Sequence, residues 1–209
     1  KGTDFKIAET RTQGSMAMHT IIQNDEKNYD IDVAIVFDSA NLAGLGAQAS
    51  RNMIANAFRS EMTRFAREPE VKTGCVRVYY KTGYHIDFAI FRRSKHYEWQ
   101  ERYDYAYAGD TWSARDIKAL DVWFINEVKA KTDDLRKIVR LSKMFCKSRE
   151  DWGSMPSGLI QTILCSEQFG SSYSRIDEKF YRTLKSIENR LKWNLQVNAP
   201  DNVDNSRLI

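Results

Sequence analysis

The chain has 209 residues, of which 42% are hydrophobic and 29% are charged, so it is long enough for one large domain or two small lobes with a real core. No apolar run approaches the length that spans a bilayer and no secretory signal opens the chain, so we expect no membrane partner. The net charge of +4 is compatible with binding phosphates, but it is too weak to indicate a nucleic-acid partner.

The cysteines indicate a reducing compartment. Cys75, Cys146 and Cys165 are far apart and form no CxxC pair, which argues against a disulfide framework and against a zinc ribbon. We therefore expect a cytoplasmic protein. The sequence begins at Lys1 rather than Met, so we also expect it to be a fragment of a longer chain.

The first part of the chain predicts strands joined by turns and by one long helix. An amphipathic helix is predicted over residues 47–67, because apolar residues recur at steps of three and four and Pro69 lies just beyond. Residues 76–91 predict a hairpin with its turn at Gly83. The other predictions are a strand within 4–15 that runs into a turn at Gly14 and Ser15, a short helix over 16–22, a polar loop over 23–28 and a strand that begins at Asp30.

From about Ser113 the hydrophobic pattern becomes helical. Helices are predicted within 116–131, 133–147, 157–169 and 176–193. An α+β fold follows, with a mixed-sheet lobe over 1–112 and an all-helical lobe over 113–209.

Three acidic residues carry the chemistry that the sequence indicates. Asp30 and Asp32 stand at alternate positions at the head of an apolar strand, so their side chains share one face and repel each other. Asp87, on the second hairpin strand, supplies a third carboxylate. Carboxylates on strands are the ligands that Mg²⁺ prefers, with Mn²⁺ as an alternative ion. The competing interpretation is that these acids are solvated or paired with Lys or Arg.

The dipeptide of Gly14 and Ser15 favours the first interpretation. Glycine permits close approach of the backbone to a ligand, and a serine hydroxyl beside free N–H groups at a helix start suits a phosphate. As a dipeptide alone, Gly-Ser is more often just a turn. Its place between one strand and the strand bearing the acid pair gives it weight.

This arrangement resembles the polymerase-β-like nucleotidyltransferase superfamily, whose signature is a Gly-Ser turn, an Asp-X-Asp strand and a later third Asp. Within it the chain looks most like the cGAS/DncV-like nucleotidyltransferases (CD-NTases), on "QGSMAMHTII", "YDIDVAIVF", "YHIDFAIF" and a helical segment within 135–167. The resemblance implies a polymerase-β-like catalytic lobe followed by a helical lobe, with the active site in the cleft between them.

One helix of the second lobe carries a basic stripe. Arg136, Arg140, Lys143 and Lys147 step by four, three and four residues, which places them on one side of a helix. A solvated face is the plain interpretation. The resemblance implies instead that Lys143, and Ser157 further on, contact nucleotide phosphates, with Gln13 as a further candidate for the same pocket.

The resemblance implies a Mg²⁺-dependent enzyme that joins NTP substrates into a cyclic di- or trinucleotide in bacterial anti-phage signalling. In it Asp30, Asp32 and Asp87 are the catalytic metal ligands, and Gly14 and Ser15 hold the donor triphosphate. The resemblance also implies a regulatory protein partner encoded in a defence operon. Two alternatives stay open: an enzyme that makes linear oligonucleotides or modifies RNA or protein, and an inactive nucleotide-binding scaffold.

Overall fold

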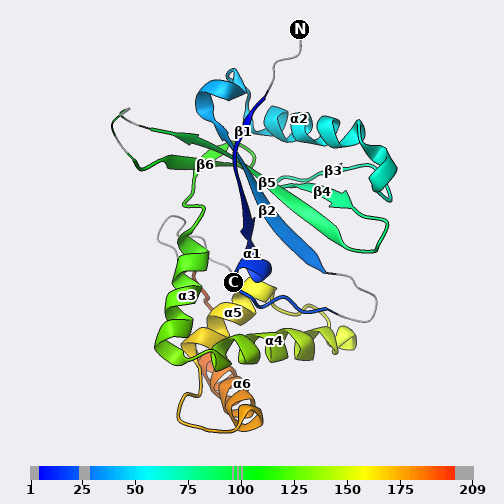
Figure 1. Cartoon of the computed structure of the whole chain (residues 1–209). Helices are drawn as coiled ribbons and strands as arrows, with labels where there is room; N and C mark the ends of the chain where they lie inside the picture. The colour runs from blue at the N-terminus through cyan, green and yellow to red at the C-terminus, as the bar shows by residue number, and fades with distance from the viewer. Residues whose placement is uncertain (1–4, 24–28, 96, 98, 100, 201–209) are drawn as a thin grey trace. The chain divides into compact units, whose positions relative to one another are not determined.

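The computed structural model describes residues 5–23, 29–95, 97, 99 and 101–200. Contacts divide the chain into two compact units (Figure 1). The sheet unit takes the chain up to Gln13 and from Gln23 to Ile117. The helical unit takes Gly14–Ile22 and the chain from Lys118 onward. The segment Gly14–Ile22 thus belongs to the helical unit, whereas the sequence analysis placed it in the lobe over 1–112. That the lobes over 1–112 and 113–209 are functional domains stays a prediction.

The sheet unit contains one mixed seven-stranded sheet among the described residues. Its strands run in the order β1-β2-β5-β4-β3, and β6 pairs with both β5 and β7. β2 and β5 are parallel, and the other pairs are antiparallel. The strands are β1 (Ile7–Gln13), β2 (Asp30–Asp38), β3 (Glu70–Val71), β4 (Val76–Tyr79), β5 (His85–Ser94), β6 (Asp104–Ala108) and β7 (Trp112–Ala114).

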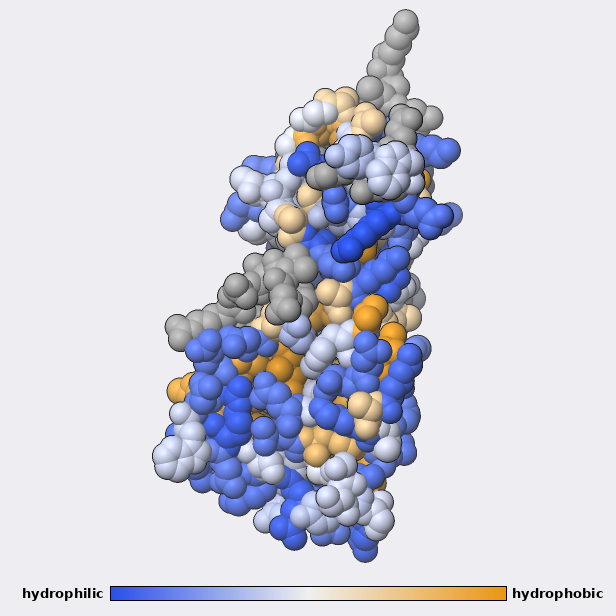
Figure 2. Space-filling view, turned by 90° about the vertical axis from the view of Figure 1, so that its left-hand side faces the viewer, coloured by the Kyte–Doolittle hydropathy of each residue, from blue (hydrophilic) through white to orange (hydrophobic). Residues whose placement is uncertain are grey.

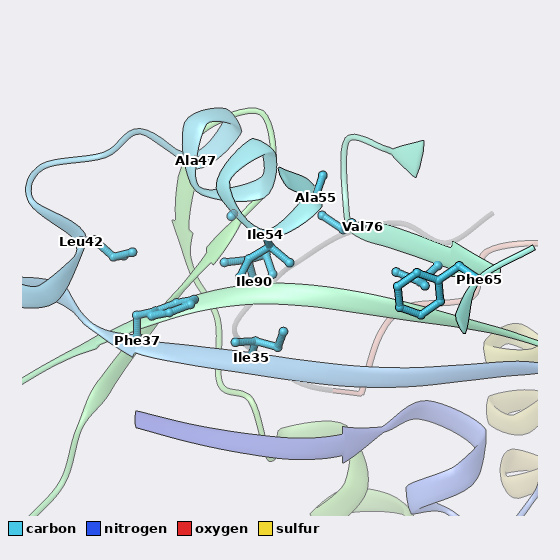
Figure 3. Close-up of a cluster of buried hydrophobic side chains, with 11 residues drawn as sticks. Ile35, Phe37, Leu42, Ala47, Ile54, Ala55, Phe65, Val76 and Ile90 are labelled. Carbon is cyan, nitrogen blue, oxygen red and sulfur yellow. The ribbon is translucent and has the colours of Figure 1, made fainter. Parts of the chain in front are cut away.

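The central strand β2 is apolar because both of its faces are buried. Ile35 and Phe37 pack into a core cluster beneath α2 (Ala47–Arg59), which lies along one face of the sheet (Figures 1 and 3). Ala34 and Val36 pack on the opposite face with Phe91. Continuous burial on two sides explains an unbroken apolar run in place of the alternation that a half-exposed strand shows.

The predicted helix over 47–67 is too long. Helix α2 ends at Arg59, and a short 3₁₀ turn, η2 (Met62–Arg64), follows. Phe65 then forms an isolated β-bridge with Tyr80 and packs edge-on against Phe58, with ring centroids 5.8 Å apart. The core therefore gains more from Phe65 on the sheet than a continuing helix would give it, which is why tertiary packing overrides the helical period here. A second 3₁₀ turn, η1 (Ser39–Leu42), follows β2.

The hairpin prediction over 76–91 is confirmed, since β4 and β5 pair in antiparallel register across the turn at Gly83. The helical pattern begins later than Ser113, because β7 occupies Trp112–Ala114. The aromatic residues before it are partly in β6, where Tyr105 and Tyr107 pack on the Phe91 cluster.

The helical unit is built around the buried residues of α4, which include Leu135, Ile138 and Val139. These residues form the buried side of the helix, whereas Arg140 of the basic stripe is exposed. No helix among the described residues is long and apolar enough to cross a bilayer. Charged and polar residues cover most of the face seen in Figure 2. The helices are α1 (Gly14–Ala17), α3 (Ala119–Lys131), α4 (Asp134–Lys147), the 3₁₀ turn η3 (Glu150–Trp152), α5 (Gly158–Glu167) and α6 (Ile176–Trp193).

Thr132, the residue that ends α3, has an unfavourable backbone conformation, with φ 86° and ψ 161°. Such dihedrals are almost confined to glycine and cost a β-branched residue about 1–3 kcal/mol. Thr132→Gly should therefore raise the free energy of unfolding by about 1 kcal/mol, after the entropy that glycine loses on folding is subtracted. Thermal or urea unfolding measures this. Thr132→Ala removes nearly the same atoms but keeps the strain, so an equal gain in both variants would refute the explanation.

Candidate active site

The sheet places the three predicted acids on one face. Asp32 and Asp87 are direct partners in the parallel register of β2 and β5, and Asp30 is the partner of His85. Side chains of register partners on neighbouring strands point to the same side, and residues two apart on one strand do so as well. All three carboxylates therefore leave the sheet on the face that carries Ala34 and not on the face covered by α2.

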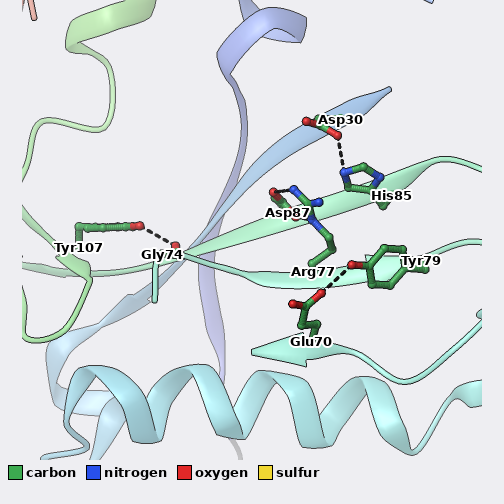
Figure 4. A network of polar contacts seen from close by, with 8 residues as sticks. All are labelled: Asp30, Glu70, Gly74, Arg77, Tyr79, His85, Asp87 and Tyr107. Carbon is green, nitrogen blue, oxygen red and sulfur yellow. Dashed lines mark hydrogen bonds and ion pairs between the residues drawn. The ribbon is translucent and has the colours of Figure 1, made fainter. Parts of the chain in front are cut away.

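Two of these acids have basic residues as partners (Figure 4). Arg77, on β4, donates from Nε to Oδ1 of Asp87 and from Nη2 to Oδ2, each at 2.7 Å. His85 Nε2 contacts Oδ1 of Asp30. The competing interpretation, an acid paired with Arg, holds for Asp87.

The ion pair determines the charge of Asp87. Burial raises the pKa of this carboxyl, but hydrogen bonding to Arg77 and the charge of its guanidinium outweigh burial and leave the pKa below its ordinary value. The pKa of Arg77 is raised, chiefly by the same hydrogen bonds. Next to them, burial and then the charge of Asp87 raise the pKa of the Cys75 thiol to about 12. Asp87 is thus an ionised carboxylate and Cys75 is a neutral thiol.

The donor set suits Mg²⁺ by its chemistry, because carboxylate oxygens on adjacent strands are the ligands that this ion takes. The side chains are not arranged for it as they stand. Among the residues that the structure describes, no three His, Cys, Asp or Glu side chains form a group that would hold a metal ion. The ion pair of Asp87 with Arg77 and the contact of Asp30 with His85 give a physical reason.

Gln13 and Gly14 mark the point at which the chain leaves the sheet. Gln13 is the register partner of Asp32, and its side-chain amide donates to the carbonyl oxygen of Ile117 at 3.2 Å. Gly14 follows at once with φ 61°, a left-handed conformation that favours glycine. Gly14 and Ser15 thus open α1 and do not form a separate turn, and the short helix predicted over 16–22 begins earlier and ends at Ala17.

The helical unit brings Ser15 and Lys143 to the same residue, Thr20. The carbonyl oxygen of Ser15 accepts from the backbone N–H of Thr20 at 2.8 Å. Lys143 Nζ lies 3.0 Å from Thr20 Oγ1 and 3.4 Å from its carbonyl oxygen. Thr20 is fully buried, and sequence reasoning missed it because an isolated threonine in a short, largely apolar segment carries no signal.

Lys143 also lies beside the start of α5. A Cβ atom on Gly158 would stand 3.3 Å from Lys143 Cε. A cavity of about 280 Å³ adjoins this contact, and Lys143, Lys147 and Gly158 are among its lining residues. The preceding Ser157 caps the helix, since its Oγ accepts from the backbone N–H of Ile160 at 3.4 Å. Lys143 and Ser157 thus lie close together at the start of α5 in the helical unit. That they contact a nucleotide remains a prediction.

The basic stripe is not uniformly solvated. Arg136 Nε donates to the carbonyl oxygen of Met18 at 3.2 Å, and Lys143 contacts Thr20, so two members of the stripe bind the turn that follows α1. Arg140 is exposed. The stripe therefore has a structural role at the Gly-Ser segment, in addition to any role toward a ligand.

Comparison with known proteins gives these features a family context. Residues 8–91, which contain the Gly-Ser turn and all three acids, match the family described as "Cyclic GMP-AMP synthase DncV-like, nucleotidyltransferase domain". A "Cyclic GMP-AMP synthase" of Escherichia albertii is 28% identical in an alignment 207 residues long, which covers 94% of this chain and 44% of that protein. The chain thus spans less than half the length of this curated relative.

Solved structures agree on the fold. A structure of Vibrio cholerae DncV, a cyclic AMP-GMP synthase, is matched over 96% of this chain and 56% of its own, with a TM-score of 0.71 and 22% identity. Escherichia coli DncV bound to 3'-deoxy GTP is matched over the same shares, with a TM-score of 0.70 and 21% identity. The predicted α+β nucleotidyltransferase fold is confirmed. Over residues 8–91 the chain is thus similar in sequence to the DncV-like nucleotidyltransferase domain, and over most of its length it is similar in fold to DncV.

Proposed function

We propose that this protein is a Mg²⁺-dependent nucleotidyltransferase that joins NTPs into a cyclic di- or trinucleotide and releases pyrophosphate. The observation that carries the proposal is the placement of Asp30, Asp32 and Asp87 on one face of two parallel strands, within the residues that match the family. The family match supports nucleotidyl transfer, and the name of the curated relative supports a cyclic product.

In the proposed reaction, a ribose hydroxyl oxygen forms a bond to the α-phosphorus of a nucleoside triphosphate. The bond from that phosphorus to the bridging oxygen of the β-phosphate breaks, pyrophosphate leaves with the electron pair, and the hydroxyl proton passes to water. When bound, a divalent ion would lower the pKa of the attacking hydroxyl and would neutralise negative charge on the phosphates. This ion would be Mg²⁺ or Mn²⁺, and it would be bound by Asp30, Asp32 and Asp87.

The donor triphosphate would be held by Gln13, Gly14, Ser15, Lys143 and Ser157. Gly14 offers backbone without a side chain in the way, and Ser15 offers a hydroxyl. Lys143 acts as a point charge toward the phosphates, and it opposes the negative charge that develops on departing pyrophosphate. We place the protein in the cytoplasm, in anti-phage signalling, with a regulatory protein of the same operon as partner.

Mass spectrometry of reaction products tests the proposal. The intact protein is incubated with all four NTPs and Mg²⁺ or Mn²⁺, and the products are treated with phosphatase. A cyclic product has no terminal phosphate, so it keeps its mass after treatment. A linear product that loses its 5′ phosphates would establish the open-chain alternative, and nucleotide binding without consumption would establish the inactive scaffold.

A further inference from the structure

The ion pair of Arg77 and Asp87 occupies the atoms that a metal ion would need. Each carboxylate oxygen of Asp87 accepts a hydrogen bond at 2.7 Å, one from Nε and one from Nη2 of Arg77. This two-point pairing of a guanidinium with a carboxylate is among the strongest charge-assisted contacts in proteins. The side chains are 21% and 15% exposed, so water screens the pair only in part.

The strands do not depend on this ion pair for their register. Backbone pairing joins β4 to β5 at four successive positions, and Arg77 and Asp87 are one of these partners. The ladder fixes the positions of both residues whether or not their side chains meet. The two-point contact is therefore available for a function other than joining the strands.

A divalent ion and Arg77 compete for the same carboxylate. A ligand oxygen must approach Mg²⁺ or Mn²⁺ to about 2.1 Å, and on each oxygen of Asp87 one of the two lone-pair sites is taken by an N–H group of Arg77. The positive charge of Arg77 also opposes a second cation at this distance. The absence of a three-donor metal group among the described residues agrees with this competition.

We propose that Arg77 is the internal counter-cation of Asp87, and that a divalent ion binds by replacing it. Arg77 thereby sets the metal affinity of the site, and its positive charge balances the charge of the Asp87 carboxylate until the ion binds. The proposal rests on the proposed function, because it takes Asp87 to be a metal ligand. It assigns to Arg77 a role in positioning Asp87 and no contact with the reacting atoms.

The size of the effect follows from population arithmetic. A ligand that binds only the state with an open ion pair is weakened by the fraction of molecules in that state. A charge-assisted contact that keeps about nine molecules in ten closed weakens binding about tenfold. Arg77→Met should therefore tighten Mn²⁺ binding about tenfold, whereas Arg77→Lys, which keeps the charge and loses the two-point contact, should tighten it by less.

The chain offers a matched control in Arg93. This residue, on β5, pairs with Asp38 on β2, with Nε 2.7 Å from Oδ1, and the pair lies at the opposite end of β2 from Asp30. Arg93→Met removes the same charge from the same sheet. It should leave the Mn²⁺ dissociation constant within about twofold of wild type, which separates local competition from a change in net charge.

The test is an electron paramagnetic resonance titration of Mn²⁺ on the intact protein, without nucleotide. The expected order of affinity is Arg77→Met, then Arg77→Lys, then wild type together with Arg93→Met. Wild-type binding that is equal to, or tighter than, that of both Arg77 variants would overturn the competition. Tightening by the same factor in Arg77→Met and Arg93→Met would overturn it too, because charge alone would then explain the result.

A second measurement uses the wild-type protein alone, so it does not depend on whether a variant folds. The Nε–H signal of Arg77 in ¹⁵N spectra of the wild-type protein should shift when Mg²⁺ is added, while that of Arg93 stays in place. A stationary Arg77 signal at saturating metal would contradict the exchange. If neither wild type nor any variant binds Mn²⁺, the metal site of the proposed function is refuted. If wild type binds Mn²⁺ and the double variant Asp30→Asn with Asp32→Asn does not, the metal site is supported, and the Arg77 variants then test only the role of Arg77.

Discussion

Asp30→Asn combined with Asp32→Asn is expected to abolish nucleotide joining, with a loss on the order of a thousandfold or more. Asparagine keeps the shape of each side chain but removes the charge on which Mg²⁺ binding depends. The melting temperature should change little, because the Asp30 side chain is 59% exposed and relief of carboxylate repulsion offsets its lost contact with His85. Product formation is measured by mass spectrometry and folding by thermal unfolding.

Asp38→Asn is the matched control for this double variant. Asp38 ends the same strand and points to the same face as Asp32, but it pairs with Arg93 and lies away from the other acids. Product formation should survive this substitution. Wild-type turnover in the double variant, or an equal loss in Asp38→Asn, would mean that Asp30 and Asp32 are structural and that the proposed mechanism is wrong.

Lys143→Ala is expected to weaken the use of NTPs by about 1.5–3 kcal/mol, the usual range for a charge-assisted contact. A nucleoside triphosphate carries about four negative charges, of which divalent ions neutralise only part, so a point charge on the donor side has a large effect. The comparison of kcat/KM for NTP between wild type and variant measures it. Lys147→Ala, one turn further along α4 and on the same cavity, should cost less.

The contact of Lys143 with Thr20 provides the control for a merely structural role. Thr20→Val removes the hydroxyl that Lys143 reaches at 3.0 Å while keeping the shape of the side chain. If Lys143 serves only to hold this turn, Thr20→Val and Lys143→Ala should lower stability alike and leave kcat/KM unchanged in the folded protein. Small and equal effects on kcat/KM at Lys143 and Lys147 would identify the stripe as a solvated face.

The strands and the placement of the acids could be predicted because they follow from local periodicity. An apolar run headed by Asp30 and Asp32 fixes the face of each carboxylate by alternation alone. Asp87 follows in the same way from the hairpin. The parallel pairing that makes Asp32 and Asp87 neighbours is a long-range contact that periodicity does not encode; the resemblance to a family implied only that the three acids act together.

The details that escaped prediction depend on contacts between distant segments. The end of α2 at Arg59 follows from packing of Phe65 on the sheet, which no helical period encodes. Thr20 gained its role from Lys143, more than a hundred residues away. The pairing of Arg77 with Asp87 is different, because a hairpin centred on the turn before Tyr84 already makes them cross-strand partners, so this signal was present in the sequence.

A crystal structure of the intact protein with bound nucleotide and Mn²⁺, with the ion located by its anomalous scattering, tests the central claim most directly. The account predicts a Mn²⁺ position about 2.1 Å from an oxygen of Asp30, of Asp32 and of Asp87, with the guanidinium of Arg77 released from Asp87. An ion held elsewhere, or an Asp87 carboxylate more than about 6 Å from the other two with nucleotide bound, would contradict the claim that these three residues form one catalytic metal site.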